Sequence, residues 1–88
     1  MKIKDGFLLR RFADDYVVVA VGDGAEEFNK LITLNAVGKF IYDLLLEGNT
    51  RDGIVAAVLE KYEIDRETAE RDADVFISGL RSAGLLDE

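Results

Sequence analysis

The chain has 88 residues, of which 18 are acidic and 11 basic, and its net charge is −7; it contains neither cysteine nor histidine. A chain of this length predicts a single domain over residues 1–88 with one modest hydrophobic core. Without cysteine and histidine there are no disulfides, no thiolate or imidazole metal ligands, and none of the usual nucleophiles or near-neutral acid–base groups. We therefore expect neither an enzyme nor a bound cofactor.

The same composition bears on partners and location. A negative net charge opposes nonspecific attraction to nucleic acid and to anionic membrane surfaces. No apolar stretch approaches the roughly 18 residues of a membrane span, and the charged first 12 residues are not followed by a long apolar run. The lack of cysteine is typical of proteins in a reducing compartment. The expectation is a soluble cytoplasmic protein that binds neither nucleic acid nor membrane.

The first third of the chain predicts a small antiparallel sheet. Residues 7–12 (FLLRRF) and 16–21 (YVVVAV) indicate two strands of a hairpin, because the second run is β-branched and almost wholly apolar. A turn at residues 22–24 (GDG) leads to a third strand at residues 28–33, where side chains alternate with the period of a strand. In a three-stranded meander the third strand lies at an edge, and half of its backbone groups have no partner in the sheet.

The sequence changes from strand to helix at Asn35. Apolar residues from Val37 onwards recur at the spacing of one helical face, and an asparagine side chain can accept a hydrogen bond from an unpaired N–H of the first helical turn. This helix is expected to run to about Glu47, because Gly48 suits the left-handed position just past a helix end.

Two more helices should follow. Thr50 is the expected N-cap of a second helix that ends at residues 63–64, and Asp65 can cap a third helix that ends at Gly84. Residues 85–86, both leucine, are expected to fold back against the sheet or the helix end. The order β-β-β-α-α-α predicts an α+β, winged-helix-like domain in which helices cover one face of a three-stranded antiparallel sheet.

The third helix has a second face beside the stripe expected to enter the core. Asp72, Val75, Gly79 and Ser82 line up there, at spacings of three and four residues. A glycine inside a helix costs about 1 kcal/mol relative to alanine, so Gly79 indicates a close approach to the helix backbone. Either another element of the same domain packs against Gly79, or this face forms one wall of a groove.

If this wall lies beside the edge of the third strand, an extended peptide can join the sheet as a fourth strand. An edge of this length offers about six backbone groups, and at ~0.5–1.5 kcal/mol per hydrogen bond they barely offset the cost of association, so side-chain pockets must add affinity. Leu31, Val75, Gly79 and Ser82 are candidates for those pockets. The alternative is an ordinary exposed edge on which Lys30 guards against aggregation.

An ordered set of residues with characteristic spacings also runs through the chain: Leu34, Asn35, Gly38, Ile41, Leu44, Gly48, Thr50, Ile54, Leu59, Tyr62, Asp72, Phe76, Leu80, Gly84, Leu85 and Leu86. From residue 7 to 86 the chain resembles the pyrroloquinoline quinone biosynthesis protein D family. The resemblance implies a winged-helix-like recognition element for ribosomally made, post-translationally modified peptides. Such a module binds the leader segment of a precursor peptide and delivers it to a modifying enzyme, which in the quinone pathway is a radical S-adenosylmethionine protein. The family serves many pathways, so the peptide stays open.

The resemblance also implies where the peptide binds, because these modules hold the leader as a strand against the third strand and the third helix. On this sequence the edge consists of Phe28, Asn29, Lys30, Leu31, Ile32 and Thr33, and the helix wall of Asp72, Val75, Phe76, Gly79 and Ser82. Asp72 is expected to pair with a basic leader residue. The alternative for Asp72 is an ordinary first-turn carboxylate favoured by the helix dipole.

Two other functions fit a winged-helix order. One is a DNA-binding regulator, against which the acidic charge argues: the second helix carries only Arg51 and Lys61, at its two ends. The other is a homodimer that pairs the same edge strands across a two-fold axis.

Overall fold

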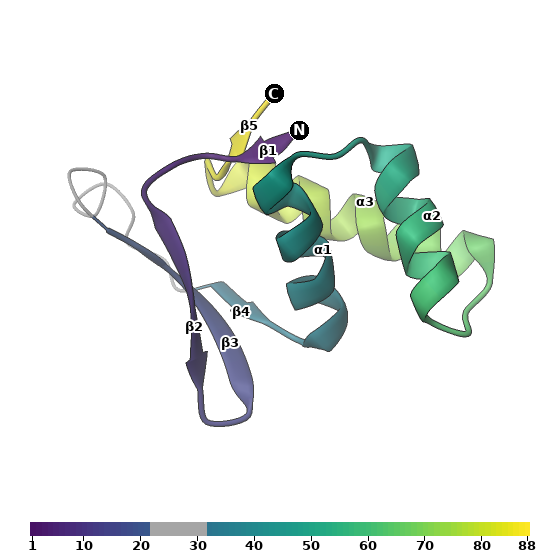
Figure 1. Cartoon of the computed structure of the whole chain (residues 1–88), viewed down its shortest axis with the longest axis horizontal. Coiled ribbons are helices and arrows are strands. Elements are labelled where there is room, and N and C mark those ends of the chain that lie inside the picture. Colours follow the sequence, from purple (N-terminus) through teal and green to yellow (C-terminus); the bar gives the residue numbers. More distant parts are fainter. Residues whose placement is uncertain (22–31) are drawn as a thin grey trace.

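The computed structural model describes residues 1–21 and 32–88 (Figure 1). The predicted turn at 22–24 and positions 28–31 of the predicted edge strand therefore lie outside the described residues. The elements are β1 (Lys2–Ile3), β2 (Phe7–Phe12), β3 (Asp15–Ala20), β4 (Ile32–Leu34), α1 (Ala36–Glu47), α2 (Arg51–Lys61), α3 (Arg66–Ser82) and β5 (Leu86–Asp87).

The main sheet has the predicted topology. Its strand order is β2-β3-β4, and both pairings are antiparallel, with Val17 of β3 opposite Arg10 of β2 and Thr33 of β4. Three helices follow, so the predicted α+β order is confirmed. Among the described residues, β4 pairs only with β3 and lies at an edge of the sheet.

A second sheet of two short strands was not predicted. β1 pairs with β5, with Lys2 opposite Asp87 and Ile3 opposite Leu86, so the two ends of the chain lie side by side (Figure 1). Strands of two residues are too short to show a period in the sequence, and their pairing depends on the whole fold. The predicted fold-back of the last leucines is confirmed, since Leu85 and Leu86 are both buried.

The helix ends follow the predicted capping residues. Asn35, Thr50 and Asp65 each accept a hydrogen bond from the backbone N–H three residues later, at 2.8, 3.0 and 3.3 Å. Each such cap satisfies one unpaired donor of the first turn and contributes about 1 kcal/mol. Gly48 and Gly84 have φ angles of 95° and 81°, in the left-handed region that glycine reaches without strain.

The second helix ends before the predicted residues 63–64. Its last residue is Lys61, and Tyr62 already has an extended backbone, with φ −117° and ψ 146°. The Tyr62 ring packs edge-on against Phe40 of α1, with ring centroids 5.8 Å apart. This aromatic contact favours the end of α2 at Lys61, because it holds the Tyr62 ring at the point where the chain leaves the helix.

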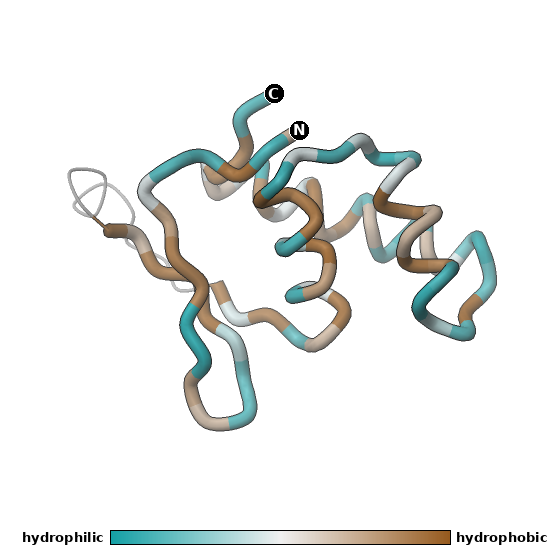
Figure 2. Tube along the Cα trace, in the orientation of Figure 1, coloured by the Kyte–Doolittle hydropathy of each residue, from teal (hydrophilic) through white to brown (hydrophobic). Residues whose placement is uncertain are grey.

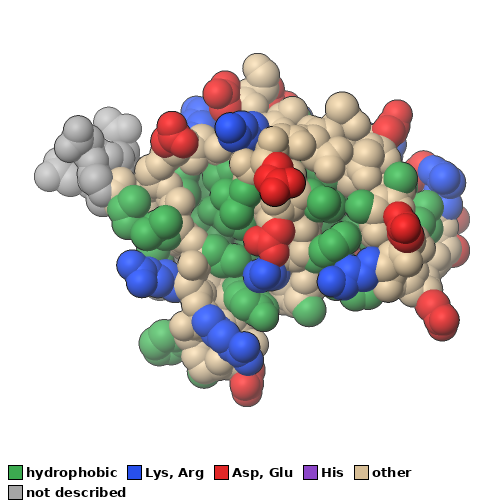
Figure 3. Space-filling view, in the orientation of Figure 1, with side chains coloured by type: hydrophobic (Ala, Val, Ile, Leu, Met, Phe, Trp, Pro, Cys, Tyr) green, Lys and Arg blue, Asp and Glu red, His purple; other side chains and the backbone are tan. Residues whose placement is uncertain are grey.

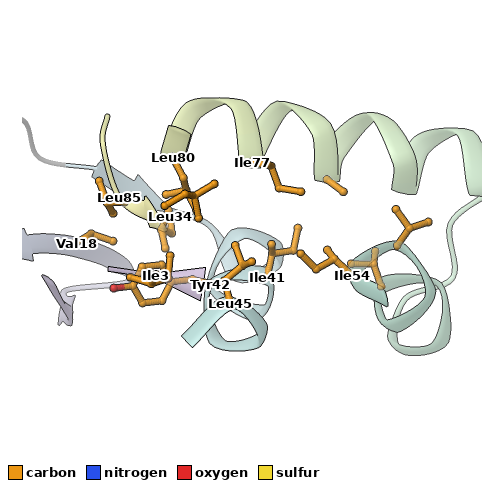
Figure 4. Close-up of a cluster of buried hydrophobic side chains, with 14 of the residues drawn as sticks. Ile3, Val18, Leu34, Ile41, Tyr42, Leu45, Ile54, Ile77, Leu80 and Leu85 are labelled. Atoms are coloured by element: carbon orange, nitrogen blue, oxygen red, sulfur yellow. The ribbon is translucent and has the colours of Figure 1, made fainter. Parts of the chain in front are cut away.

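One continuous core joins the sheet to the helices. Figure 2 shows hydrophobic segments along the strands and within the helices, with hydrophilic segments between them. In Figure 4, Leu34 of β4 lies beside Leu80 of α3, and Ile41 of α1 faces Ile77. The buried residues are Ile3, Val18, Leu34, Ile41, Tyr42, Leu45, Ile54, Val55, Val58, Ala69, Ala73, Ile77, Leu80, Leu85 and Leu86. No helix within 1–21 and 32–88 is long and apolar enough to cross a membrane.

Candidate functional site

A groove of about 280 Å³ lies between the start of α1 and the middle of α3, and we call it the α1–α3 groove. Its lining residues are Asn35, Val37, Gly38, Ile41, Asp72, Val75 and Phe76. Three of the five predicted wall residues, Asp72, Val75 and Phe76, therefore line one groove. The groove begins at Asn35, the residue that directly follows the edge strand β4.

Gly38 shapes the α1 side of this groove. A Cβ atom at this position would lie 3.1 Å from Cε1 of Phe76 and 3.3 Å from Oδ1 of Asn35, closer than ordinary van der Waals contact. The glycine therefore lets the Phe76 ring approach the helix backbone. Val37, Gly38 and Ile41 are absent from the predicted site. The signal was present for Gly38, because a glycine inside a helix indicates a close approach, as was inferred for Gly79.

The α3 side of the groove is mainly apolar. Phe76 is half-buried against the core, whereas Val75 is 68% exposed. An exposed valine next to a half-buried ring gives a surface on which an apolar partner removes further area from water, at about 25 cal/mol per Å². The groove can therefore bind an apolar side chain.

Among the described residues, Asp72 is the only charged one that lines the α1–α3 groove. Its Oδ1 lies 3.9 Å from Nε of the neighbouring Arg71, at the outer limit of an ion pair, and both side chains are well exposed. The helix begins at Arg66, so Asp72 lies in the second turn, and Glu67 is the acidic residue of the first turn. The first-turn interpretation of Asp72 is therefore wrong, because the dipole effect falls off within that turn.

Gly79 and Ser82 continue the same face of α3 but do not line the groove. Both are exposed, and apart from the backbone of its own helix no atom of the described residues lies within 4 Å of the position that a Cβ of Gly79 would occupy. Within the described residues, therefore, no other element packs against Gly79. The interpretation of this face as part of a binding wall stays a prediction.

The described part of the predicted edge adjoins the groove without lining it. Ile32 packs against the core, and Thr33 is exposed. Leu34 lies beside the groove residue Gly38, because its Cβ would be 3.5 Å from a Cβ added at that glycine. The edge strand and the groove thus meet at the end of β4. The other predicted edge residues, at positions 28–31, lie outside the described residues.

An ion pair ties α3, which carries one wall of the groove, to α2. Nε and Nη2 of Arg51 donate hydrogen bonds to Oδ1 and Oδ2 of Asp74, at 2.7 and 2.9 Å. The hydrogen bond from Arg51 holds the pKa of the Asp74 carboxyl below its ordinary value. No group of three or more acidic side chains placed to hold a metal ion occurs in the part of the chain that the structure describes.

Comparisons with known proteins agree with the fold. The chain is 34% identical to TbiB1, whose structure was solved in complex with the TbiA(beta) leader peptide; the match covers 99% of this chain and 95% of that chain, with a TM-score of 0.77. A lasso peptide synthetase B1 complexed with the leader peptide has the same fold, at 20% identity and a TM-score of 0.73, over 96% of this chain and 93% of that one. No curated protein sequence matches the chain.

The family model of coenzyme PQQ synthesis protein D (PqqD) matches residues 15–86, which include β3, β4, all three helices and the α1–α3 groove. The match spans most of the chain, and the predicted resemblance is confirmed. The chain belongs to the coenzyme PQQ synthesis protein D family.

Proposed function

We propose that this protein is a noncatalytic adaptor, a recognition element that binds the leader segment of a ribosomally made precursor peptide. It presents the peptide to a modifying enzyme, either a radical S-adenosylmethionine protein or another maturation enzyme. The observation that carries the proposal is an apolar groove beside an open strand edge, in a chain 34% identical to a protein whose structure holds a leader peptide.

In the proposed binding mode the leader joins the sheet as a strand beside β4, along residues 28–33. The free edge of β4 within the described residues supports this mode, because an added strand satisfies its outward backbone groups. Backbone pairing alone gives little net affinity, so the α1–α3 groove takes an apolar leader side chain on Val75 and Phe76. The exposed backbone at Gly79, followed by Ser82, extends the wall along the peptide.

Asp72 gives this site a charge preference. It is the only charged residue among the described lining of the groove, where its one ion-pair contact, with Arg71, is 3.9 Å long. A basic leader residue at hydrogen-bonding distance would make a shorter, charge-assisted bond. The proposed partner of Asp72 is therefore a lysine or arginine of the leader.

An adaptor needs binding groups only, which agrees with a sequence that lacks histidine and cysteine. The DNA-binding alternative has less support, because the guanidinium of Arg51 is already engaged by Asp74 and is not free to contact a phosphate. A homodimer that pairs edge strands would use the same edge as the peptide. Leader and second copy would then compete.

The test is a titration of isotope-labelled protein with the leader peptide encoded beside this gene, followed by NMR. Amide shifts should cluster on Ile32, Thr33 and the face of α3 from Asp72 to Ser82. Shifts confined to other surfaces, or none with any pathway peptide, would contradict the proposed function.

Two matched variants each add one carboxylate to α3, one of them inside the groove and the other outside it. Val75→Asp should weaken leader binding at least tenfold, because it places a second charge in the apolar lining. Ser78→Asp adds the same charge at an exposed position outside the lining and should leave affinity unchanged. Equal effects of the two substitutions would point to net charge and exclude this groove.

A further inference from the structure

A second groove lies on the other side of α1, between the hairpin and α2, and we call it the basic–aromatic groove. Its volume is about 220 Å³, and it is lined by Tyr16, Ala36, Lys39, Phe40, Asp43, Lys61 and Tyr62. At 3.6 residues per turn, the α1 residues that line it project away from Val37, Gly38 and Ile41 of the first groove. Figure 3 shows this face, where blue cationic side chains cross the surface between the hairpin and α2.

The two lysines that line this groove, and Arg11 beside it, are held over aromatic rings. Cζ of Arg11 and Nζ of Lys39 each lie 5.8 Å from the centroid of the Tyr16 ring, and Nζ of Lys61 lies 4.6 Å from the centroid of Phe40. Exposed contacts of this kind stabilise by about 0.5–1 kcal/mol each. β2, α1 and α2 thus each place one cation over the ring of Tyr16 or of Phe40.

The positive charge of this groove is incompletely neutralised. Asp43 is the only carboxylate in the part of the lining that the structure describes, and its Oδ2 pairs with Nζ of Lys39 at 2.6 Å. Among residues 1–21 and 32–88, neither Arg11 nor Lys61 forms an ion pair. By contrast, Arg51, Arg66 and Arg81 each have a carboxylate within 4 Å. In a chain with a net charge of −7, this groove is therefore locally cationic.

We propose that the basic–aromatic groove docks an acidic segment of a second protein, in which carboxylates alternate with apolar side chains. The carboxylates meet Arg11 and Lys61, and the apolar side chains pack on Phe40 and Tyr62. The identity of that protein rests on the proposed function: it is the maturation enzyme. Since the two grooves lie on opposite sides of α1, the leader and the enzyme bind at the same time.

The probe is a synthetic heptapeptide of alternating glutamate and leucine, with a control peptide that has glutamine in place of glutamate. In an NMR titration of the labelled full chain, the acidic peptide should shift the amides of Lys39, Phe40, Lys61 and Tyr62. Replacing both Arg11 and Lys61 by glutamine should raise its Kd about tenfold. Lys4→Gln, which removes an exposed lysine outside the groove, should leave the Kd unchanged.

Three outcomes would overturn the inference: equal binding of the glutamine peptide, shifts confined to other surfaces, or an unchanged Kd for the double variant. The dispersion of the NMR spectrum reports whether that variant is folded. Saturating the protein with leader should leave the Kd of the acidic peptide unchanged, and competition would also overturn the inference. If the protein binds the acidic peptide but no leader, only the proposed function is contradicted. If it binds the leader but not the acidic peptide, only the docking surface is contradicted.

Discussion

Two glycines inside helices have opposite surroundings. A Cβ at Gly38 in α1 would press on Phe76 at 3.1 Å, whereas a Cβ at Gly79 in α3 would meet no atom of the described residues within 4 Å outside its own helix backbone. Each glycine costs its helix about 1 kcal/mol relative to alanine. At Gly38 the close packing of a ring offsets this cost, and at Gly79 nothing in the described chain does. The space around a glycine thus shows whether close packing within the described residues accounts for it.

The largest expected effect tests this difference directly. Gly38→Val should lower the free energy of unfolding by about 2–3 kcal/mol, because its side chain forces Phe76 and the Asn35 cap to move. The matched substitution Gly79→Val should change it by less than about 0.5 kcal/mol, since valine and glycine differ little in helix propensity and the space is open. Urea unfolding of both variants measures the difference, and equal values would contradict the comparison.

A smaller substitution at Gly79 separates stability from binding. Gly79→Ala should raise the free energy of unfolding by about 1 kcal/mol through helix propensity. It should also weaken leader binding about tenfold, because the added methyl group stands where the peptide is proposed to approach. Calorimetric titration gives the affinity. A more stable variant with unchanged affinity would place Gly79 outside the binding wall.

The next prediction concerns Tyr42, a core residue of α1. Its side chain is fully buried, its hydroxyl has no hydrogen-bond partner among the described residues, and burial raises the pKa of that hydroxyl. Tyr42→Phe should therefore raise the free energy of unfolding by about 1 kcal/mol, because an unpaired buried hydroxyl is costly. Tyr62→Phe, at a half-buried ring, is the control and should be nearly neutral. A loss of stability in Tyr42→Phe would indicate that the hydroxyl is hydrogen-bonded in solution.

The smallest expected effect concerns the ion pair that fixes α3 against α2. Arg51 lowers the pKa of Asp74 in the folded state below its ordinary value of 3.8. The pair therefore stabilises the fold fully at pH values above 3.8. This stabilisation is lost as the pH falls through the lowered pKa. Asp74→Asn should therefore reduce the loss of stability at acid pH. The control is Asp5→Asn, at an exposed position that forms no ion pair with the described residues. Both groups are on the surface, so the change in melting temperature should be small.

The parts of the fold that depend on neighbouring residues could be predicted from the sequence. Asn35, Thr50 and Asp65 cap their helices as expected, because a cap needs only the next three residues. The β1–β5 pair could not be predicted, since it joins residues from opposite ends of the chain.

Only the α3 side of the α1–α3 groove was predicted from the sequence. Asp72, Val75 and Phe76 share a helical face, which the spacing of the sequence displays. Their partners across the groove come from the N-cap and first two turns of α1, more than 30 residues earlier, and helical period carries no information about which helices meet. Gly38 is the exception, because its type signals close packing even without a known partner.

The pairing of β1 with β5 brings both ends of the chain to one pole of the molecule, away from the tip of the β2–β3 hairpin (Figure 1). The amino group of Met1 donates a hydrogen bond to the backbone oxygen of Asn49 at 3.0 Å, and the Arg81 guanidinium donates two to Glu88. A fold whose ends meet can be inserted into a surface loop of a larger protein through two short links. The same geometry makes this chain a suitable scaffold for circular permutation.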